Sequence, residues 1–138
     1  MNMRYPAVLL LPWLLAACSD AVGEADRATS NLIVQDITLP EGADELASYG
    51  QFYARDGGDR IVYVFVAANP ALRSLGWLDC LRSDANPISC QTYQGGDVRW
   101  VKSPDDLPKM SDGGCTLISG AYDLKRKMNL FIACNGVA

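Results

Sequence analysis

The feature that most constrains the fold is a pair of strand-like stretches separated by a glycine turn. Residues 50–55 and 60–67 are rich in aromatic and β-branched side chains, and the tetrapeptide Asp56–Asp59 between them contains two glycines. Glycine supplies the positive φ values that tight turns require, so this pattern predicts a β-hairpin. The run 61–66 lacks a polar alternation, which is typical of a strand covered on both faces. We therefore expect a central strand here.

Other short apolar stretches follow the same logic. The expected strands outside the first hairpin are residues 32–39, 98–102, 115–122 and 128–134. The polar segment 123–127 separates the last two and predicts a second hairpin. Short helices are expected at 43–48 and 71–75. Short strands with hairpin links predict an α+β fold, with one small domain dominated by an antiparallel β-sheet and one or two short helices.

The N-terminus has the three regions of a secretory signal. Arg4 gives a positive start, residues 5–15 are apolar, and two alanines lead into Cys18. Small residues before a cleavage point are typical of such signals. A membrane-spanning helix takes about 20 apolar residues, so this run is too short for one. Two prolines within the run also make it a poor core helix.

Residues Leu15-Ala16-Ala17-Cys18 resemble the lipobox of bacterial lipoproteins. The resemblance implies that residues 1–17 are a signal peptide and that the Cys18 thiol receives a diacylglycerol group. It also implies acylation of the new amino group, and two or more acyl chains give stable membrane anchoring. Ser19 after the cysteine is compatible with sorting to the outer membrane, facing the periplasm. We therefore expect a lipid-anchored protein of the cell envelope whose membrane partner is reached through Cys18.

Cleavage before Cys18 removes 17 of the 138 residues and leaves a chain of one-domain length. Residues 18–31 are small and acidic, and such a stretch buries too little apolar surface to offset its ordering entropy. The sequence therefore predicts a lipidated flexible tether over 18–31. The disulfide-stabilised β-rich domain is expected over 32–138.

The remaining cysteines are an even set in a chain expected in an oxidising compartment, so two disulfides are expected. Four cysteines allow three pairings. Folding about the turn signal at 84–87 brings Cys80 opposite Cys90, and pairing about 123–127 brings Cys115 near Cys134. A zinc site lacks support because the close cysteine pairs of zinc ribbons are missing, and no Cys-x-x-Cys redox motif is present.

Charge excludes a nucleic-acid partner. The chain carries 16 acidic and 12 basic residues, and no basic face suited to phosphate contacts stands out. Residues Lys125, Arg126 and Lys127 form the one cationic cluster. Such a triplet is typical of a solvated turn, and the alternative interpretation is a contact with a partner.

The residues give no catalytic motif, and we expect no enzyme, no cofactor and no metal site. The chain has no histidine, which removes histidine-based nucleophile pairs, histidine acid–base catalysis and the commonest metal ligand. Asp105 and Asp106 follow a Ser-Pro pair, where acidic residues cap a helical turn. Asp56, Asp59 and Asp112 stand next to glycines and are interpreted as turn residues rather than calcium ligands.

Binding is then the expected activity. Large amphipathic side chains, among them Trp77 and Trp100, are candidates for a contact patch, although most such residues pack the core of a small sheet. We expect a non-catalytic accessory protein that binds an envelope protein or polymer. The alternatives are a periplasmic inhibitor or immunity protein against a toxin or wall hydrolase, and a hydrolase that uses carboxylates.

The segments Asp112–Cys115, Tyr122-Asp123 and Cys134–Gly136 resemble a pattern in small proteobacterial envelope proteins. The resemblance implies a shared cysteine-closed hairpin and carries over no activity.

Overall fold

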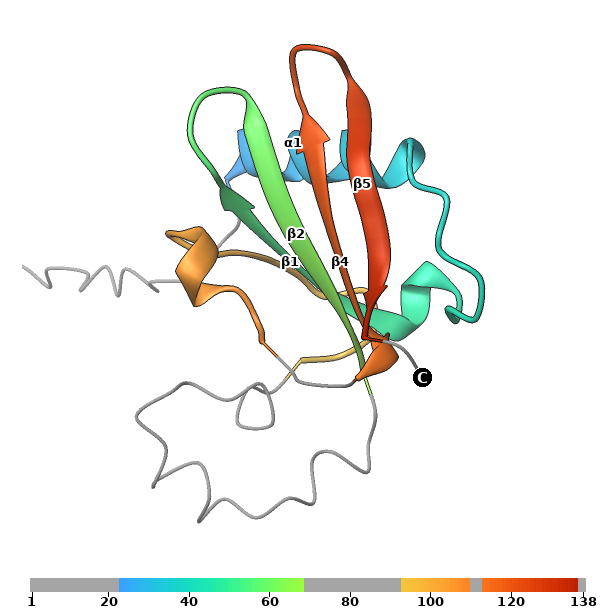
Figure 1. The fold of residues 1–138 in the computed structure, drawn as a ribbon. Helices are drawn as coiled ribbons and strands as arrows, with labels where there is room; N and C mark the ends of the chain where they lie inside the picture. Colours follow the sequence, from blue (N-terminus) through green and yellow to red (C-terminus); the bar gives the residue numbers. More distant parts are fainter. Residues whose placement is uncertain (1–22, 69–92, 110–112, 137–138) are drawn as a thin grey trace, which may run out of the picture.

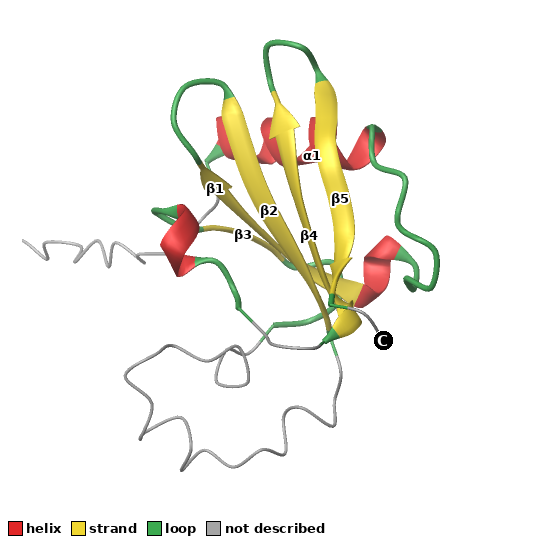
Figure 2. Cartoon of the chain, viewed as in Figure 1, coloured by secondary structure: helices red, strands yellow, loops and turns green. Residues whose placement is uncertain are grey.

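A computed structural model describes residues 23–68, 93–109 and 113–136. In these ranges a five-stranded sheet carries one α-helix on one face (Figures 1 and 2). The helices are α1 (Glu24–Gln35) and the short 3-10 helices η1 (Leu46–Ser48) and η4 (Pro104–Asp106). The strands are β1 (Tyr49–Arg55), β2 (Arg60–Ala67), β3 (Val98–Trp100), β4 (Gly114–Asp123) and β5 (Met128–Asn135). This arrangement is a small α+β domain, as the sequence predicts.

Both expected hairpins are present. β1 pairs antiparallel with β2, and β4 pairs antiparallel with β5. Gly57 and Gly58 have φ values of 68° and 49° in the first turn, a left-handed conformation that glycine adopts most readily. The strand order is β3-β1-β2-β4-β5, so β2 lies at the centre of the sheet. Five of its eight residues are buried, which confirms the central strand inferred from 61–66.

The sheet is mainly antiparallel, as expected, but one edge is parallel. β3 pairs with β1 in parallel, with Gln51 opposite Val98 and Tyr53 opposite Trp100. The chain between β2 and β3 spans residues 68–97. A parallel pair needs a crossover of a dozen or more residues, and this connection is long enough to provide one.

The N-terminal part of the domain also differs from the expectation. Residues 24–35 form α1, so the strand predicted over 32–39 is wrong, and residues 24–31 belong to a helix rather than to a flexible tether. Ser30 and Ile33 are buried, and their separation of three residues is a helical spacing. Alanines favour helix, and Glu24 and Asp26 lie in the first turn, where acidic side chains favour a helix. The packing of one narrow face of α1 against the sheet therefore outweighs the strand preference of the β-branched residues at its end.

Two apolar cores lie on the two faces of the sheet. Figure 1 shows α1 crossing one face, and the core beneath it is rich in aromatic side chains. Its buried members are Ile33, Tyr49, Tyr53, Ile61, Tyr63, Phe65, Ile118 and Tyr122. The core on the other face consists of Phe52, Val64, Val66, Tyr93 and Leu117, with Leu107 packed against it. We refer to the first as the helix-side core.

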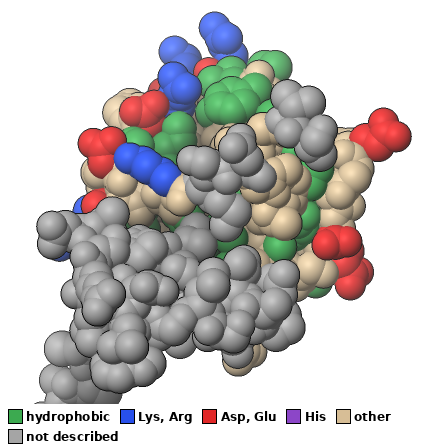
Figure 3. Space-filling model, turned by 60° about the horizontal axis from the view of Figure 1, so that its bottom comes forward, with side chains coloured by type: hydrophobic (Ala, Val, Ile, Leu, Met, Phe, Trp, Pro, Cys, Tyr) green, Lys and Arg blue, Asp and Glu red, His purple; other side chains and the backbone are tan. Residues whose placement is uncertain are grey.

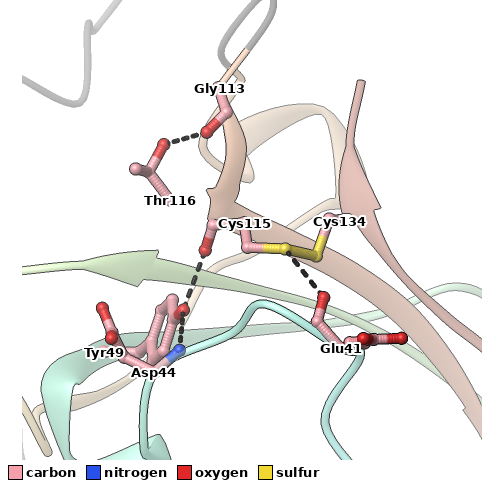
Figure 4. The surroundings of a disulfide bond; sticks show 7 residues. All are labelled: Glu41, Asp44, Tyr49, Gly113, Cys115, Thr116 and Cys134. Carbon is pink, nitrogen blue, oxygen red and sulfur yellow. Dashed lines mark hydrogen bonds between the residues drawn. A yellow bond between two sulfur atoms is a disulfide. The ribbon is translucent and has the colours of Figure 1, made fainter. Parts of the chain in front are cut away.

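A disulfide closes the β4–β5 hairpin at the end opposite its turn (Figure 4). Cys115 and Cys134 form the expected pair, with their Cα atoms 4.5 Å apart. The Tyr49 hydroxyl donates to the Cys115 carbonyl oxygen at 2.8 Å and accepts from the Asp44 amide at 3.1 Å. The Cys115 sulfur, which carries no hydrogen in a disulfide, contacts the Glu41 carbonyl oxygen at 3.6 Å. These contacts fix the loop after α1 against the start of β4.

The second expected disulfide, Cys80–Cys90, lies outside the described residues. The same holds for Cys18, for Trp77 and for Asp112.

Candidate functional site

The candidate site lies at the end of the sheet where both hairpins turn. α1 lies at this end because both of its ends are bonded to residues beside the turns (Figure 1). Arg55, the last residue of β1, pairs with Asp26 at 2.8 Å. Asn129, near the start of β5, donates from Nδ2 to the Asp36 carbonyl oxygen at 3.0 Å. The chain therefore enters α1 at the same end of the domain as the two turns.

The β4–β5 turn carries the cationic cluster. Lys125, Arg126 and Lys127 are all exposed in this turn. Asp123 organises it, because its Oδ1 accepts from the Arg126 amide at 2.9 Å and its Oδ2 lies 3.7 Å from Arg126 Nε. Lys127 has a φ of 53°, in the left-handed region that ends tight turns. Lys125 and Lys127 have no ion-pair partner within the ranges that the structure describes.

Large apolar side chains on β5 stand in solvent next to these cations. Met128, Leu130 and Phe131 are 46%, 43% and 48% exposed. β5 is an edge strand, and Leu130 sits in a β-bulge, because Phe131 pairs with Ala121 while Asn129 pairs with Tyr122. Figure 3 shows green apolar side chains beside blue Lys and Arg at the upper end of the molecule.

We name this surface the hairpin tip and define it as Lys125, Arg126, Lys127, Met128, Leu130 and Phe131. It combines three cationic groups with three apolar side chains that water does not favour. This combination of exposed apolar area and positive charge on one hairpin makes the hairpin tip the candidate contact surface.

Tyr63 reaches across β4 to hold the base of the hairpin tip. Its ring lies over Gly120, where an added Cβ atom would come within 2.3 Å of the hydroxyl oxygen and closer still to the ring. The Tyr63 hydroxyl donates to Asn129 Oδ1 at 2.7 Å, and the same amide donates to Asp36. Glycine at 120 therefore allows one chain of hydrogen bonds to join β2, β5 and the end of α1.

Burial controls the titration of the core tyrosines. Desolvation raises the pKa of Tyr53 well above its usual value, and the neighbouring Tyr63 adds to the increase. Desolvation also raises the pKa of Tyr63, with a further contribution from Asp36. The Tyr53 hydroxyl donates to Gln51 Oε1 at 2.7 Å inside the core. These hydroxyls are therefore neutral hydrogen-bond donors that serve the fold.

Trp100, a candidate for a contact surface, packs against the helix-side core. Its ring stacks on Tyr53 with centroids 5.4 Å apart, and the Arg55 guanidinium carbon lies 5.2 Å from its centroid. Trp100 lies on β3, the edge strand opposite β5. The structure thus separates it from Lys125, Arg126 and Lys127.

Three aspartates singled out in the sequence have structural partners. Ser103 accepts from the Asp105 amide at 3.1 Å, and Asp106 Oδ2 accepts from the Ser103 amide at 3.2 Å. This capping box confirms the predicted role of the two aspartates. Asp56 pairs with Arg60 at 3.4 Å across its turn. Over the described ranges, no three His, Cys, Asp or Glu side chains gather closely enough to hold a metal ion.

The apolar half of the hairpin tip was missed by the sequence reasoning. The stretch 128–134 is apolar enough to look like a buried strand, and its position at the sheet edge decides its exposure. The sequence does contain one signal for this surface, because Met128 follows the cationic triplet directly along the chain.

Comparison of the chain with protein-family models, curated proteins and solved structures gives no match. Among the described residues, the helices are too short or too polar to span a membrane.

Proposed function

We propose that the protein is exported, is anchored in the cell envelope by lipid on Cys18, and acts without catalysis through contact of the hairpin tip with an envelope component. The anchor rests on the lipobox-like residues 15–18. The observation that carries the contact role is the exposure of Met128, Leu130 and Phe131 beside three cations.

The disulfide supports export. Bonds of this kind persist in oxidising compartments such as the periplasm and are rare where cellular thiols are kept reduced. Cys115 and Cys134 are joined on facing ends of β4 and β5, close to further contacts from Tyr49 and Glu41. A cross-link built into the packing in this way fits a chain that folds outside the cytosol.

The hydrogen bonding of the core tyrosines supports a role in binding rather than in catalysis. The hydroxyls of Tyr49, Tyr53 and Tyr63 are bonded within the fold. The exposed groups of the hairpin tip instead offer apolar area and positive charge together, which is the chemistry of recognition surfaces.

Membrane fractionation tests the anchor. Replacement of Cys18 by Ala should move the protein from the membrane pellet to the soluble envelope fraction, because the thiol that accepts the lipid is gone. Replacement of Ser19 by Ala is the matched control, since it leaves the thiol in place, and this variant should stay in the pellet. Cys18→Ala protein that still sediments with membranes would contradict the anchor.

A further inference from the structure

We propose that the hairpin tip lies against the anionic phospholipid surface in which the chain is anchored, and so fixes the orientation of the domain on the membrane. This inference rests on the proposed lipid anchor at Cys18. It goes further, because it names the partner of the hairpin tip and the face of the domain that meets the bilayer.

The position of α1 carries the geometric part of the argument. Glu24 begins α1, and the bonds of Asp26 to Arg55 and of Asn129 to Asp36 hold both helix ends at the turn end of the sheet. Five residues lie between Cys18 and Glu24, and the six residue-to-residue steps of an extended chain span about 20 Å at most. The lipid therefore holds the turn end of the domain, rather than the disulfide end, close to the bilayer.

The chemistry of the hairpin tip favours anionic lipid. Lys125 and Lys127 offer positive charge that no described ion pair consumes, and phospholipid headgroups of negative charge attract such groups. Exposed Met128 and Phe131 gain nothing from a water-soluble acidic polymer, whereas the headgroup–acyl boundary accepts apolar side chains.

The neighbouring turn sharpens the orientation. The β1–β2 turn carries Asp59 and Asp56, and the charge of Asp56 is paired with Arg60, so this turn offers no excess of positive charge to an anionic surface. The domain should therefore tilt so that the β4–β5 turn, and not the β1–β2 turn, meets the headgroups. Contact of two hairpin tips from two copies is disfavoured, because it brings two sets of three cations together.

The local concentration makes a weak contact sufficient. A short tether holds the hairpin tip near the surface at high effective concentration, so modest affinity per side chain gives high occupancy. The contact should weaken as salt rises, because its charged part is screened.

Lysine footprinting on the acylated protein tests the inference, since the chain has four lysines and all are exposed: Lys102, Lys109, Lys125 and Lys127. Protein purified from membranes is placed in vesicles of phosphatidylglycerol with phosphatidylcholine, or of phosphatidylcholine alone, and treated with an amine-reactive ester; neither lipid carries an amine that would consume the reagent. Modification of Lys125 and Lys127 should fall at least about threefold in the anionic vesicles. Lys102 and Lys109 serve as internal controls and should react equally in both.

Charge variants give the matched comparison, with peroxide oxidation of Met128 as the readout. Met128 should be protected in anionic vesicles in the native chain and in a Lys102→Glu, Lys109→Glu variant. A Lys125→Glu, Lys127→Glu variant has the same net charge and should lose this protection, because its surface contact weakens by about tenfold or more.

If each of the four lysines reacts to the same extent in the anionic and in the phosphatidylcholine vesicles, the inference is overturned. Protection that depends on protein density and not on lipid charge would also overturn it, because a second copy would then cover the hairpin tip. The intact mass of the protein, measured before reconstitution, distinguishes failure of the lipid anchor from failure of the proposed orientation. A chain without acyl groups counts against the anchor itself, whereas an acylated chain with unprotected Lys125 and Lys127 counts against the orientation alone.

Discussion

Replacement of Asn129 by Ala should destabilise the turn end of the domain more than its half-buried position indicates. The change leaves the Tyr63 hydroxyl, on a side chain 1% exposed, without the acceptor that lies 2.7 Å away. An orphaned buried donor costs about 1–3 kcal/mol. The Asp36 carbonyl also loses its donor, but it is exposed and binds water instead. We expect a loss of about 2 kcal/mol in the free energy of unfolding.

Tyr63→Phe should cost less, about 1 kcal/mol, because Asn129 keeps its bond to Asp36 and can turn its free acceptor toward water. In the double variant no orphaned hydroxyl remains. Its loss should therefore be smaller than the sum of the single losses by about 1 kcal/mol.

These costs form a double-mutant cycle of the parent chain, the two single variants and the double variant. Urea unfolding, followed by circular dichroism, measures the stability of all four in the unacylated Cys18→Ala background. The slope of the unfolding free energy with urea should stay constant across the variants. Additivity of the Tyr63 and Asn129 costs to within about 0.5 kcal/mol would show that the two side chains act independently, and would refute the reasoning.

Three further outcomes follow from the same contacts. Gly120→Ala should cost about 3 kcal/mol in urea unfolding, since its methyl group would overlap the Tyr63 ring, and near-normal stability would contradict the packing. Loss of the disulfide in a Cys115→Ala, Cys134→Ala variant should cost about 3 kcal/mol for a sequence separation of 19 residues, and an unchanged urea midpoint would argue against the cross-link. Burial raises the folded-state pKa of Tyr53 and Tyr63 above the unfolded value of about 10, so their contribution to stability is complete below that pH and is lost as pH rises toward the folded-state pKa. Tyrosinate absorbance should then increase together with the loss of circular dichroism, and full ionisation of a still-folded chain would contradict this.

Local signals account for the parts of the fold that the sequence predicts. The first hairpin is encoded by glycines between two apolar stretches, and the cap of η4 by Ser103 with Asp106. The Cys115–Cys134 pair follows from a turn that brings its flanking strands together. In each case the interacting residues lie near one another in sequence or are related by one turn.

The remaining features depend on contacts between distant segments. The large apolar side chains of α1 stand in succession at 32–34, so its helical pattern emerges only when Ser30 and Ile33 meet the aromatic core. The parallel placement of β3 depends on a long connection whose path no local signal fixes. The fit of Tyr63 over Gly120 requires the register between β2 and β4, which sequence patterning does not supply.

The hairpin tip, too, could be predicted only in part from the sequence. Its cations are visible in the sequence as a triplet, whereas the exposure of Phe131 depends on β5 being the edge of the sheet. Apolar residues in a strand are ordinarily counted toward the core, so the surface could be recognised only once the strand order was known.

The central claim is that the chain works as an exported protein held by lipid, and the intact mass of the protein from native membranes tests it most directly. The account predicts a chain that starts at Cys18, carries acyl groups at that residue, and has Cys115 and Cys134 oxidised to a disulfide. A chain that still begins at Met1, has no acyl mass and has both thiols free would contradict it.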